Sequence, residues 1–251
     1  AYGWTFGKGP VAGVTPVRNM LDEMERPLPK TVDGWPLHAL PRGAAKKQKH
    51  ASRGASQIRF AGNISGYDLG EHAKQLAKRQ QKSTGGGLGS ATPVSTPLMI
   101  GGMTAGAVEL AKELLSPLGL EPLQAGGGGD VEKDAPTRYV DGGAIGVQLI
   151  RGEMSAQGLG TVTRVEGDKL VAFGHPMMES GVTALPTAIG RVLWFLASDQ
   201  RSFKIGMAVR PVGALVADRQ ASIVVSHSAK APVIPVKMRI KGVPGAPDQS
   251  W

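Results

Sequence analysis

Alternating apolar and polar residues are concentrated in the C-terminal part of the chain. Short runs of this kind, separated by turn residues, predict strands over residues 145–150, 160–165, 169–173, 203–209, 213–217, 222–225 and 233–240. Residues 185–197 are ambiguous between strand and helix, because their β-branched content is low but Gly190 interrupts any helix. Several short strands with regular turn signals are typical of a barrel or a sandwich.

The first 26 residues predict a compact unit. Residues 1–6 and 11–14 are strand-like and flank a turn, and Thr15-Pro16 then predicts a helix with Thr15 as its N-cap. Apolar residues at helical spacing share one face of this helix: Val17, Met20, Leu21 and Met24.

Residues 27–143 mix loops with two helical patterns. A linker rich in Pro, Gly and Lys (27–55), a strand near 57–61 and a basic helix near 67–82 are followed by a segment from 92 to 100. Thr104–Leu118 predicts an amphipathic helix, with apolar residues at Val108, Leu110, Ala111, Leu114 and Leu115. A second flexible connection covers 124–139. The predicted fold class is mainly β, with an α+β insertion and a few helices.

Composition agrees with this picture and removes some chemistries. The 251 residues include 36 Gly and 18 Pro, which suits short strands joined by tight turns better than long helices. The absence of cysteine excludes disulfides, thiolate metal sites and a cysteine nucleophile. No apolar run approaches the roughly 20 residues of a membrane span, so we expect no transmembrane segment.

The net charge of +9 is concentrated in two stretches. Residues 42–53 carry five Lys or Arg and no acidic residue, and residues 74–82 add four more. Such stretches could bind an anionic partner. However, no aromatic residues or nucleic-acid motif are interleaved with the charges, which argues against nucleic acid and favours a solvated surface.

One histidine stands out. His175 follows the hairpin 160–173 and lies between Gly174 and Pro176, which favour a fixed backbone. Histidine can accept and return a proton near neutral pH, so His175 is either a structural residue or a positioned general base. No convincing nucleophile accompanies it, because Ser180 and Ser202 lack the glycine-framed turn that exposes a nucleophilic serine.

The other candidates are weaker. His38 and His50 lie in loop-rich sequence and His72 on a helix. His227 and Ser228 are adjacent on a strand, so their side chains point to opposite faces and do not form a dyad. Neither a metal-ligand spacing nor a cofactor motif is present, and we predict no metal and no cofactor. The glycines at 101–106 and 126–129 predict turns and caps rather than a phosphate site.

Several residues together resemble the SpoIVB-type serine peptidase family. They are Thr161-Val162-Thr163, Phe173-Gly174-His175-Pro176, Ser202-Phe203-Lys204, Gly213, Asp218-Arg219 and residues 232–236. Residues 1–4 and 11–21 also resemble the segment that follows the nucleophile box of that family, a Gly-x-Ser-Gly-Ser-Pro turn. No such box occurs in residues 1–251.

The resemblance implies chymotrypsin-like β-barrel elements and a serine endopeptidase exported by a bacterium to the periplasm or beyond. It implies that His175 is the general base and that the nucleophilic serine lies upstream of residue 1, so that this piece alone is inactive. The implied partners are a protein or peptide substrate and the upstream part of the same protein. It also implies three ranges: 1–26 as the end of a peptidase barrel, 27–143 as a linker and α/β insertion, and 144–251 as the β-rich domain with the Gly-His-Pro motif.

Two other readings of the sequence stay open. The chain could be a non-catalytic β-rich binding or scaffold module that uses its basic stretches at 42–53 and 74–82 to contact an anionic surface or a partner protein. It could also be an inactive homologue that keeps the peptidase fold for regulation. Asp218-Arg219 could be an internal ion pair, a turn, or a group that orients His175.

Overall fold

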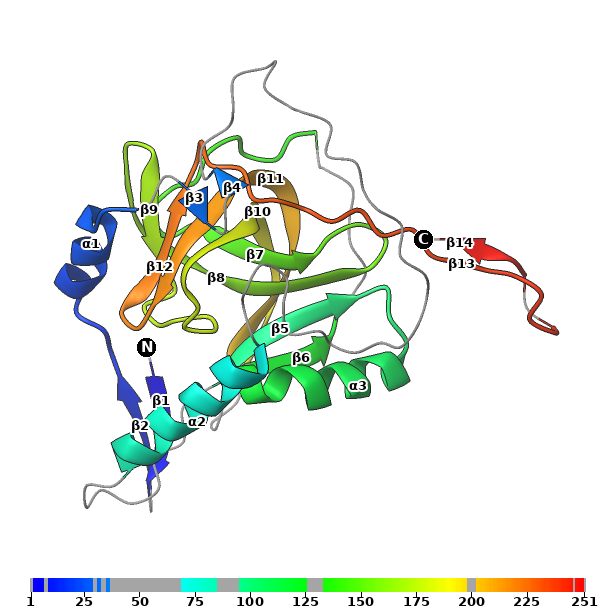
Figure 1. The fold of residues 1–251 in the computed structure, drawn as a ribbon. Helices are drawn as coiled ribbons and strands as arrows, with labels where there is room; N and C mark the ends of the chain where they lie inside the picture. The colour runs from blue at the N-terminus through cyan, green and yellow to red at the C-terminus, as the bar shows by residue number, and fades with distance from the viewer. Residues whose placement is uncertain are drawn as a thin grey trace.

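The computed structural model describes residues 2–6, 9–28, 31–32, 35–36, 69–84, 95–125, 133–197, 202–245 and 247–250. Most of the strands form one mixed sheet of eight (Figure 1). They are β5 (Thr96–Gly101), β6 (Leu120–Gln124), β7 (Ala144–Ile150), β8 (Ser155–Glu166), β9 (Lys169–Ala172), β10 (Gly181–Leu196), β11 (Phe203–Arg219) and β12 (Ser222–Ser226). The order across the sheet is β6-β5-β8-β7-β10-β11-β12-β9.

Six of these strands close into an antiparallel barrel. The circuit runs β7-β8-β9-β12-β11-β10 and returns to β7 through residues 187–189 of β10. The first half of β8 pairs with β5 and its second half with β9, so one long strand joins the barrel to the β5–β6 extension. These findings confirm a mainly β fold with barrel elements and a few helices.

The barrel strands near β9 are apolar on both faces. Leu170, Leu215 and Ile223 point into the main core, whereas their neighbours Val171 and Val216 join a second core on the outside of the barrel. A strand that is buried on both sides reads as a continuous apolar run instead of an alternating one. That second core needs a cover, and an N-terminal helix supplies it.

Helix α1 (Val17–Glu25) lies against β9 and β12. Met20 and Met24, one turn apart, are buried against the outer core, and burial of each contributes roughly 2 kcal/mol. Glu23 is also buried and accepts a hydrogen bond from Arg219 Nη1 over 3.0 Å. The helix is therefore fixed to the barrel by apolar packing and by one charged pair.

The N-terminal hairpin of β1 (Tyr2–Phe6) and β2 (Gly9–Gly13) precedes α1 and confirms the two strands expected there. The helix start differs from the prediction. Its N-cap is Pro16, and the Thr15 hydroxyl donates instead to the carbonyl of Gly174, over 2.5 Å. The prediction of Thr15 as N-cap is wrong because a distant carbonyl takes this hydroxyl.

The α+β insertion is a β-α-β unit attached to β8. Helix α3 (Ala105–Leu115) and a short 3-10 turn (Ser116–Leu118) connect β5 to β6, which run parallel. Val108 is buried, but Leu110 and Leu114 are exposed, so the buried stripe is narrower than the sequence suggested. Helix α2 (Leu69–Thr84) confirms the basic helix and packs against the 3-10 turn.

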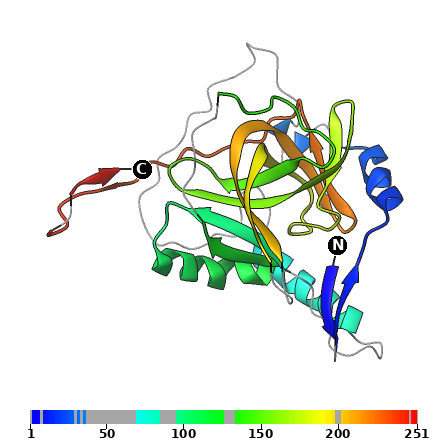
Figure 2. The same cartoon turned by 180° about the vertical axis from the view of Figure 1, so that it is seen from behind.

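Other strand predictions need adjustment. The ambiguous stretch 185–197 is β10, and the runs 203–209 and 213–217 are one continuous strand, β11. The prediction of a strand over 233–240 is wrong except at β13 (Arg239–Ile240), which pairs with β14 (Gln249–Ser250). Residues 231–241, the C-terminal arm, begin at the outer core, against which Ala231 packs, run along the barrel and then leave it toward β13 and β14 (Figures 1 and 2). The predicted strand at 57–61 and most of the linker 27–55 lie outside the described residues.

Strands β3 (Thr31–Val32) and β4 (Trp35–Pro36) form a separate small pair. No helix in the described part of the chain combines the length and the apolar character that crossing a membrane requires.

Candidate active site

His175 follows a strained turn at the end of β9. Phe173 and Gly174 both have a φ of 73°, and the Gly174 N–H donates to the carbonyl of Ala172, which closes a three-residue turn about Phe173. A left-handed φ is rare for a bulky residue and costs on the order of 1–3 kcal/mol. Contacts elsewhere must therefore hold this turn, which aims His175.

The Phe173 ring packs on Gly160 of β8. A β-carbon added at Gly160 would lie 2.1 Å from a ring carbon of Phe173, so only glycine fits beneath the ring. The Phe173 ring in turn lies 5.5 Å from the His175 ring, measured between centroids. The hairpin that delivers His175 therefore also fixes the aromatic neighbour of the imidazole.

The loop after His175 is held by the buried carboxylate of Asp218. Asp218 Oδ1 accepts the N–H of Met177 over 2.7 Å, and Oδ2 accepts the N–H groups of Met178 (2.8 Å) and Ser180 (3.2 Å) and the Ser180 hydroxyl (3.2 Å). Asp218 is completely buried in β11. Asp218 and Arg219 do not form an ion pair with each other. Asp218 binds the backbone of the loop that carries His175, while Arg219 pairs with Glu23.

Three other segments contact the same loop. Thr15 donates to the carbonyl of Gly174, and His72 Nε2 on α2 donates to the carbonyl of Met178 over 2.6 Å. The hydroxyl oxygen of Thr96 on β5 lies 3.5 Å from the carbonyl oxygen of Met177. Residues from four distant parts of the sequence thus fix a loop of eight residues, 173–180.

The tautomer of His175 follows from its neighbour. His175 Nδ1 lies 2.7 Å from the carbonyl oxygen of Pro176. Because a carbonyl can only accept, Nδ1 carries the proton, and in the neutral imidazole Nε2 is then the basic nitrogen. Burial lowers the pKa of His175 below 6.5, while the hydrogen bond to Pro176 and the charge of Asp218 raise it. The ring is therefore neutral at pH 7 and able to accept a proton.

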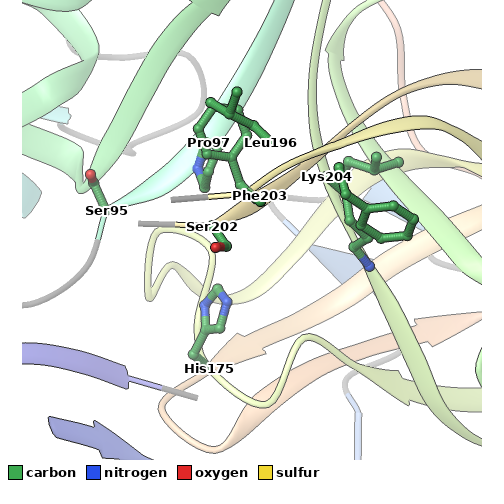
Figure 3. Close-up of a pocket in the computed structure, with 10 residues that line it drawn as sticks. Ser95, Pro97, His175, Leu196, Ser202, Phe203 and Lys204 are labelled. Carbon is green, nitrogen blue, oxygen red and sulfur yellow. The ribbon is translucent and has the colours of Figure 1, made fainter. Parts of the chain in front are cut away.

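His175 lines an open pocket of about 370 Å³. The pocket collects residues from β5, β8, β10 and β11, and Figure 3 shows His175 at its base with the hydroxyl of Ser202 above it. Its lining is Ser95, Pro97, Leu159, His175, Phe195, Leu196, Ala197, Ser202, Phe203 and Lys204. A half-buried neutral imidazole beside an open, mostly apolar space is suited to proton transfer.

Ser180 and Ser202, the two serines near His175 in the sequence, lie in different places. Ser180 is part of the loop and donates its hydroxyl to Asp218. Ser202 shares the pocket with His175, as does Ser95, whose hydroxyl donates to Glu121 over 3.1 Å. Sequence reasoning missed Ser95, Leu159 and Lys204 as pocket residues, because strands distant in the sequence bring them together.

His227 lies in a different environment. Its ring packs against Tyr139, with centroids 5.1 Å apart, and its Nε2 is buried without a hydrogen-bond partner. The Asp168 carboxylate accepts the hydroxyls of Ser226 (2.5 Å) and Ser228 (2.9 Å) and the N–H of Ser228. This network fixes a turn, in agreement with the expectation that Ser228 and His227 form no dyad.

The glycine-rich turn at 101–106 has the expected role. A β-carbon at Gly102 would lie 2.2 Å from the carbonyl oxygen of Glu153, and the Thr104 side chain caps α3 by accepting the N–H of Ala107. Turn and capping duty is therefore confirmed. His38, His50, the glycines 126–129 and the basic stretch 42–53 lie outside the described residues.

Among the described residues, no group of three or more His, Cys, Asp and Glu side chains is arranged to hold a metal ion. The described residues that line the pocket supply one neutral imidazole, one ammonium group and two hydroxyls. No protein-family model, no curated protein and no solved structure matches this chain.

Proposed function

We propose that this chain is the histidine-bearing part of an exported bacterial serine endopeptidase of the SpoIVB type. His175 is the general base, and the nucleophilic serine comes from a segment that precedes residue 1. The observation that carries the proposal is the geometry of His175. Its Nδ1 is occupied by the carbonyl of Pro176, its Nε2 is basic, and it lines an open pocket at the end of a tightly held loop.

The position of the N-terminal hairpin supports this assignment. The start of β1 lies beside the loop 173–180 in both views of the fold (Figures 1 and 2). Thr15 binds the carbonyl of Gly174, next to His175, and α1 covers β9. A chain segment that precedes β1 would thus enter the molecule close to the imidazole. The resemblance puts the nucleophile box in that segment.

The proposed reaction uses the imidazole twice. The serine hydroxyl attacks the peptide carbonyl while His175 Nε2 takes its proton, and the imidazolium then gives this proton to the leaving amine. Water attacks the acyl-enzyme by the same route, with His175 again as base, and restores the serine. The low pKa of His175 keeps the base form present at pH 7.

The test uses the longer polypeptide that includes the upstream segment. His175→Ala is expected to lower the rate of peptide cleavage by at least about 10³-fold, since it removes the base from a catalytic unit. His227→Gln is the matched control, because His227 lies outside the pocket, and its activity should stay close to that of the parent. Labelling by a fluorophosphonate should require the upstream serine.

Full cleavage activity in His175→Ala would refute the proposal. So would a longer polypeptide that neither cleaves peptides nor reacts with the fluorophosphonate while it remains folded.

A further inference from the structure

The apolar wall of the His175 pocket depends on one glycine in each of two paired strands. In β10 and β11, Gly190 and Gly206 lie over Leu159 of β8, and β-carbons at these positions would come within 2.8 and 2.7 Å of the Leu159 methyl groups. The two strands therefore pass close over Leu159 and continue beyond the barrel as a ribbon. This ribbon, residues 190–196 and 203–208, forms one side of the pocket.

The ribbon leaves apolar surface uncovered. Phe195 and Leu196 line the pocket yet are 66% and 43% exposed. With Pro97, Leu159 and Phe203 they offer a wall suited to a large apolar side chain. An occupant that covered these residues would gain roughly 25 cal/mol for each Å² of apolar surface removed from water.

Lys204 adds one charge to this apolar pocket. Its ammonium is half-buried and donates to the hydroxyl of Thr161, and no acidic side chain in the described part of the chain pairs with it. Burial lowers the pKa of Lys204 from 10.5, which is the effect of removing a cation from water without a counter-charge. Since His175 is neutral at pH 7, Lys204 supplies the positive charge among the described residues that line the pocket.

The edges of the ribbon favour a peptide as the occupant. β11 pairs with β12 only from Ala214 onward, and β10 pairs with β7 only at residues 187–189. The outer edges of the ribbon therefore have no strand partner among the described residues. An extended peptide can form backbone hydrogen bonds with such an edge, which a fatty acid of similar apolar and anionic character cannot do.

We propose that the His175 pocket binds an extended peptide in which a large apolar side chain lies next to a carboxylate. The apolar side chain packs on Leu159, Phe195 and Phe203, and the carboxylate binds Lys204 Nζ. This proposal names a substrate class for the peptidase proposed above. It rests on that proposed function, because only in a peptidase would the bound peptide be a substrate. The carboxylate is either that of an Asp or Glu side chain or the free C-terminus of a cleaved product.

The test measures binding, which needs no nucleophile, with residues 1–251 and fluorescein-labelled eight-residue peptides by anisotropy. Four peptides share a Gly-Ser background: Leu-Glu amidated, Leu-Gln amidated, Ser-Glu amidated, and one that ends in Leu with a free carboxylate. We expect the Leu-Glu or the free-acid peptide to bind roughly tenfold more tightly than Leu-Gln and Ser-Glu. The tighter of these two identifies the source of the carboxylate.

Variants assign the carboxylate contact. Lys204→Met should bind the preferred peptide about as weakly as Leu-Gln, while its affinity for Leu-Gln stays unchanged. Lys237→Met removes an exposed lysine that does not line the pocket and should behave as the parent. Thermal unfolding of each variant confirms that it is folded, and Lys204→Arg keeps the charge if Lys204→Met fails to fold.

Three results would overturn the inference: equal affinity for all four peptides, an unchanged preference in Lys204→Met, or tighter binding of decanoate than of any peptide. Its failure differs from failure of the peptidase proposal. Cleavage that depends on His175 without the expected binding preference removes only the substrate class. The expected binding without cleavage by the longer polypeptide leaves a peptide-binding site and removes the peptidase.

Discussion

Two histidines leave the same pair of strands at opposite ends, and they differ in what surrounds them. His175 follows β9 and His227 follows β12, its antiparallel neighbour. Burial lowers the pKa of both below 6.5. The His175 ring lines a pocket, whereas the Nε2 of His227 is buried without a partner. A lowered pKa therefore does not mark a general base. The basic nitrogen must also reach a space that a substrate can enter.

The carboxylates near the two histidines differ in their burial. Asp218 is buried and binds the loop that carries His175, whereas Asp168 is exposed and binds the serines beside His227. In both cases the carboxylate organises the backbone and hydroxyls around the histidine. The histidine is then aimed by the loop as a whole.

The largest expected difference concerns these two carboxylates. Asp218→Asn should lower the free energy of unfolding by about 3 kcal/mol, because an amide group replaces one of the two oxygens of a fully buried carboxylate that together accept four hydrogen bonds. Asp168→Asn should lower the free energy of unfolding by about 1 kcal/mol, since Asp168 is exposed and water can form hydrogen bonds with the groups of Ser226 and Ser228 that the variant no longer binds. Urea unfolding measures both. Equal losses would remove the distinction between the two carboxylates.

Next in size is the replacement of Gly160. Gly160→Ala places a methyl group against the Phe173 ring and should destabilise the fold by about 2 kcal/mol through overpacking. The ring resonances of His175 should shift and those of His227 should not, as NMR can record. Gly106→Ala, which meets nothing within 4 Å on α3, should instead stabilise by about 0.5–1 kcal/mol. Unchanged His175 resonances would contradict the role of Phe173.

A smaller effect is expected at the N-terminal contact. Thr15→Ala removes the hydrogen bond to the carbonyl of Gly174 and should cost about 1 kcal/mol of unfolding free energy, while Thr15→Ser should keep it. Hydrogen exchange of the loop amides at 177–180 should rise in Thr15→Ala only. A loop that exchanges equally in both variants would show that the N-terminal segment does not support it.

The smallest effects are on the titration of the two rings. NMR should give midpoints below 6.5 for both. Asp218→Asn should lower the pKa of His175 further, because the carboxylate favours the imidazolium, and Arg138→Gln should raise the pKa of His227. Because the folded pKa values lie below the unfolded one, the stability contribution of both rings is full above pH 6.5 and is lost as the pH falls below it. Stability that rises on acidification through this range would contradict burial as the cause.

The strands and helices could be predicted from the sequence more completely than the pairing of strands that are distant in the sequence. Runs such as Leu170-Val171-Ala172 and Ile223-Val224-Val225 are apolar on both faces, so the strands could be recognised from local pattern. His175 could be singled out because Gly174 and Pro176 frame it. The pairings of β9 with β12 and of β7 with β10, which close the barrel, join residues 40 or more positions apart and have no local signal.

The side chains that complete the site were hidden for the same reason. Asp218 was noticed only as one half of a charged dipeptide, and its four hydrogen bonds depend on β11 lying beside a loop some 40 residues earlier. Thr15 had a sufficient local explanation as a cap, and the tertiary contact with Gly174 replaced it. Lys204 and Leu159 share a pocket only because Gly190 and Gly206 let the ribbon pass over β8.

The C-terminal arm has a consequence for self-association. Its Val233, Ile234 and Val236 are more than half exposed, and an extended apolar segment of this kind invites stacking with identical chains into cross-β aggregates. Pro232 and Pro235 interrupt the segment and have no N–H to offer a neighbouring chain. Basic residues from Lys237 onward make identical arms repel each other. The arm can therefore stay extended and apolar at a concentration where an uninterrupted strand of the same hydrophobicity would precipitate.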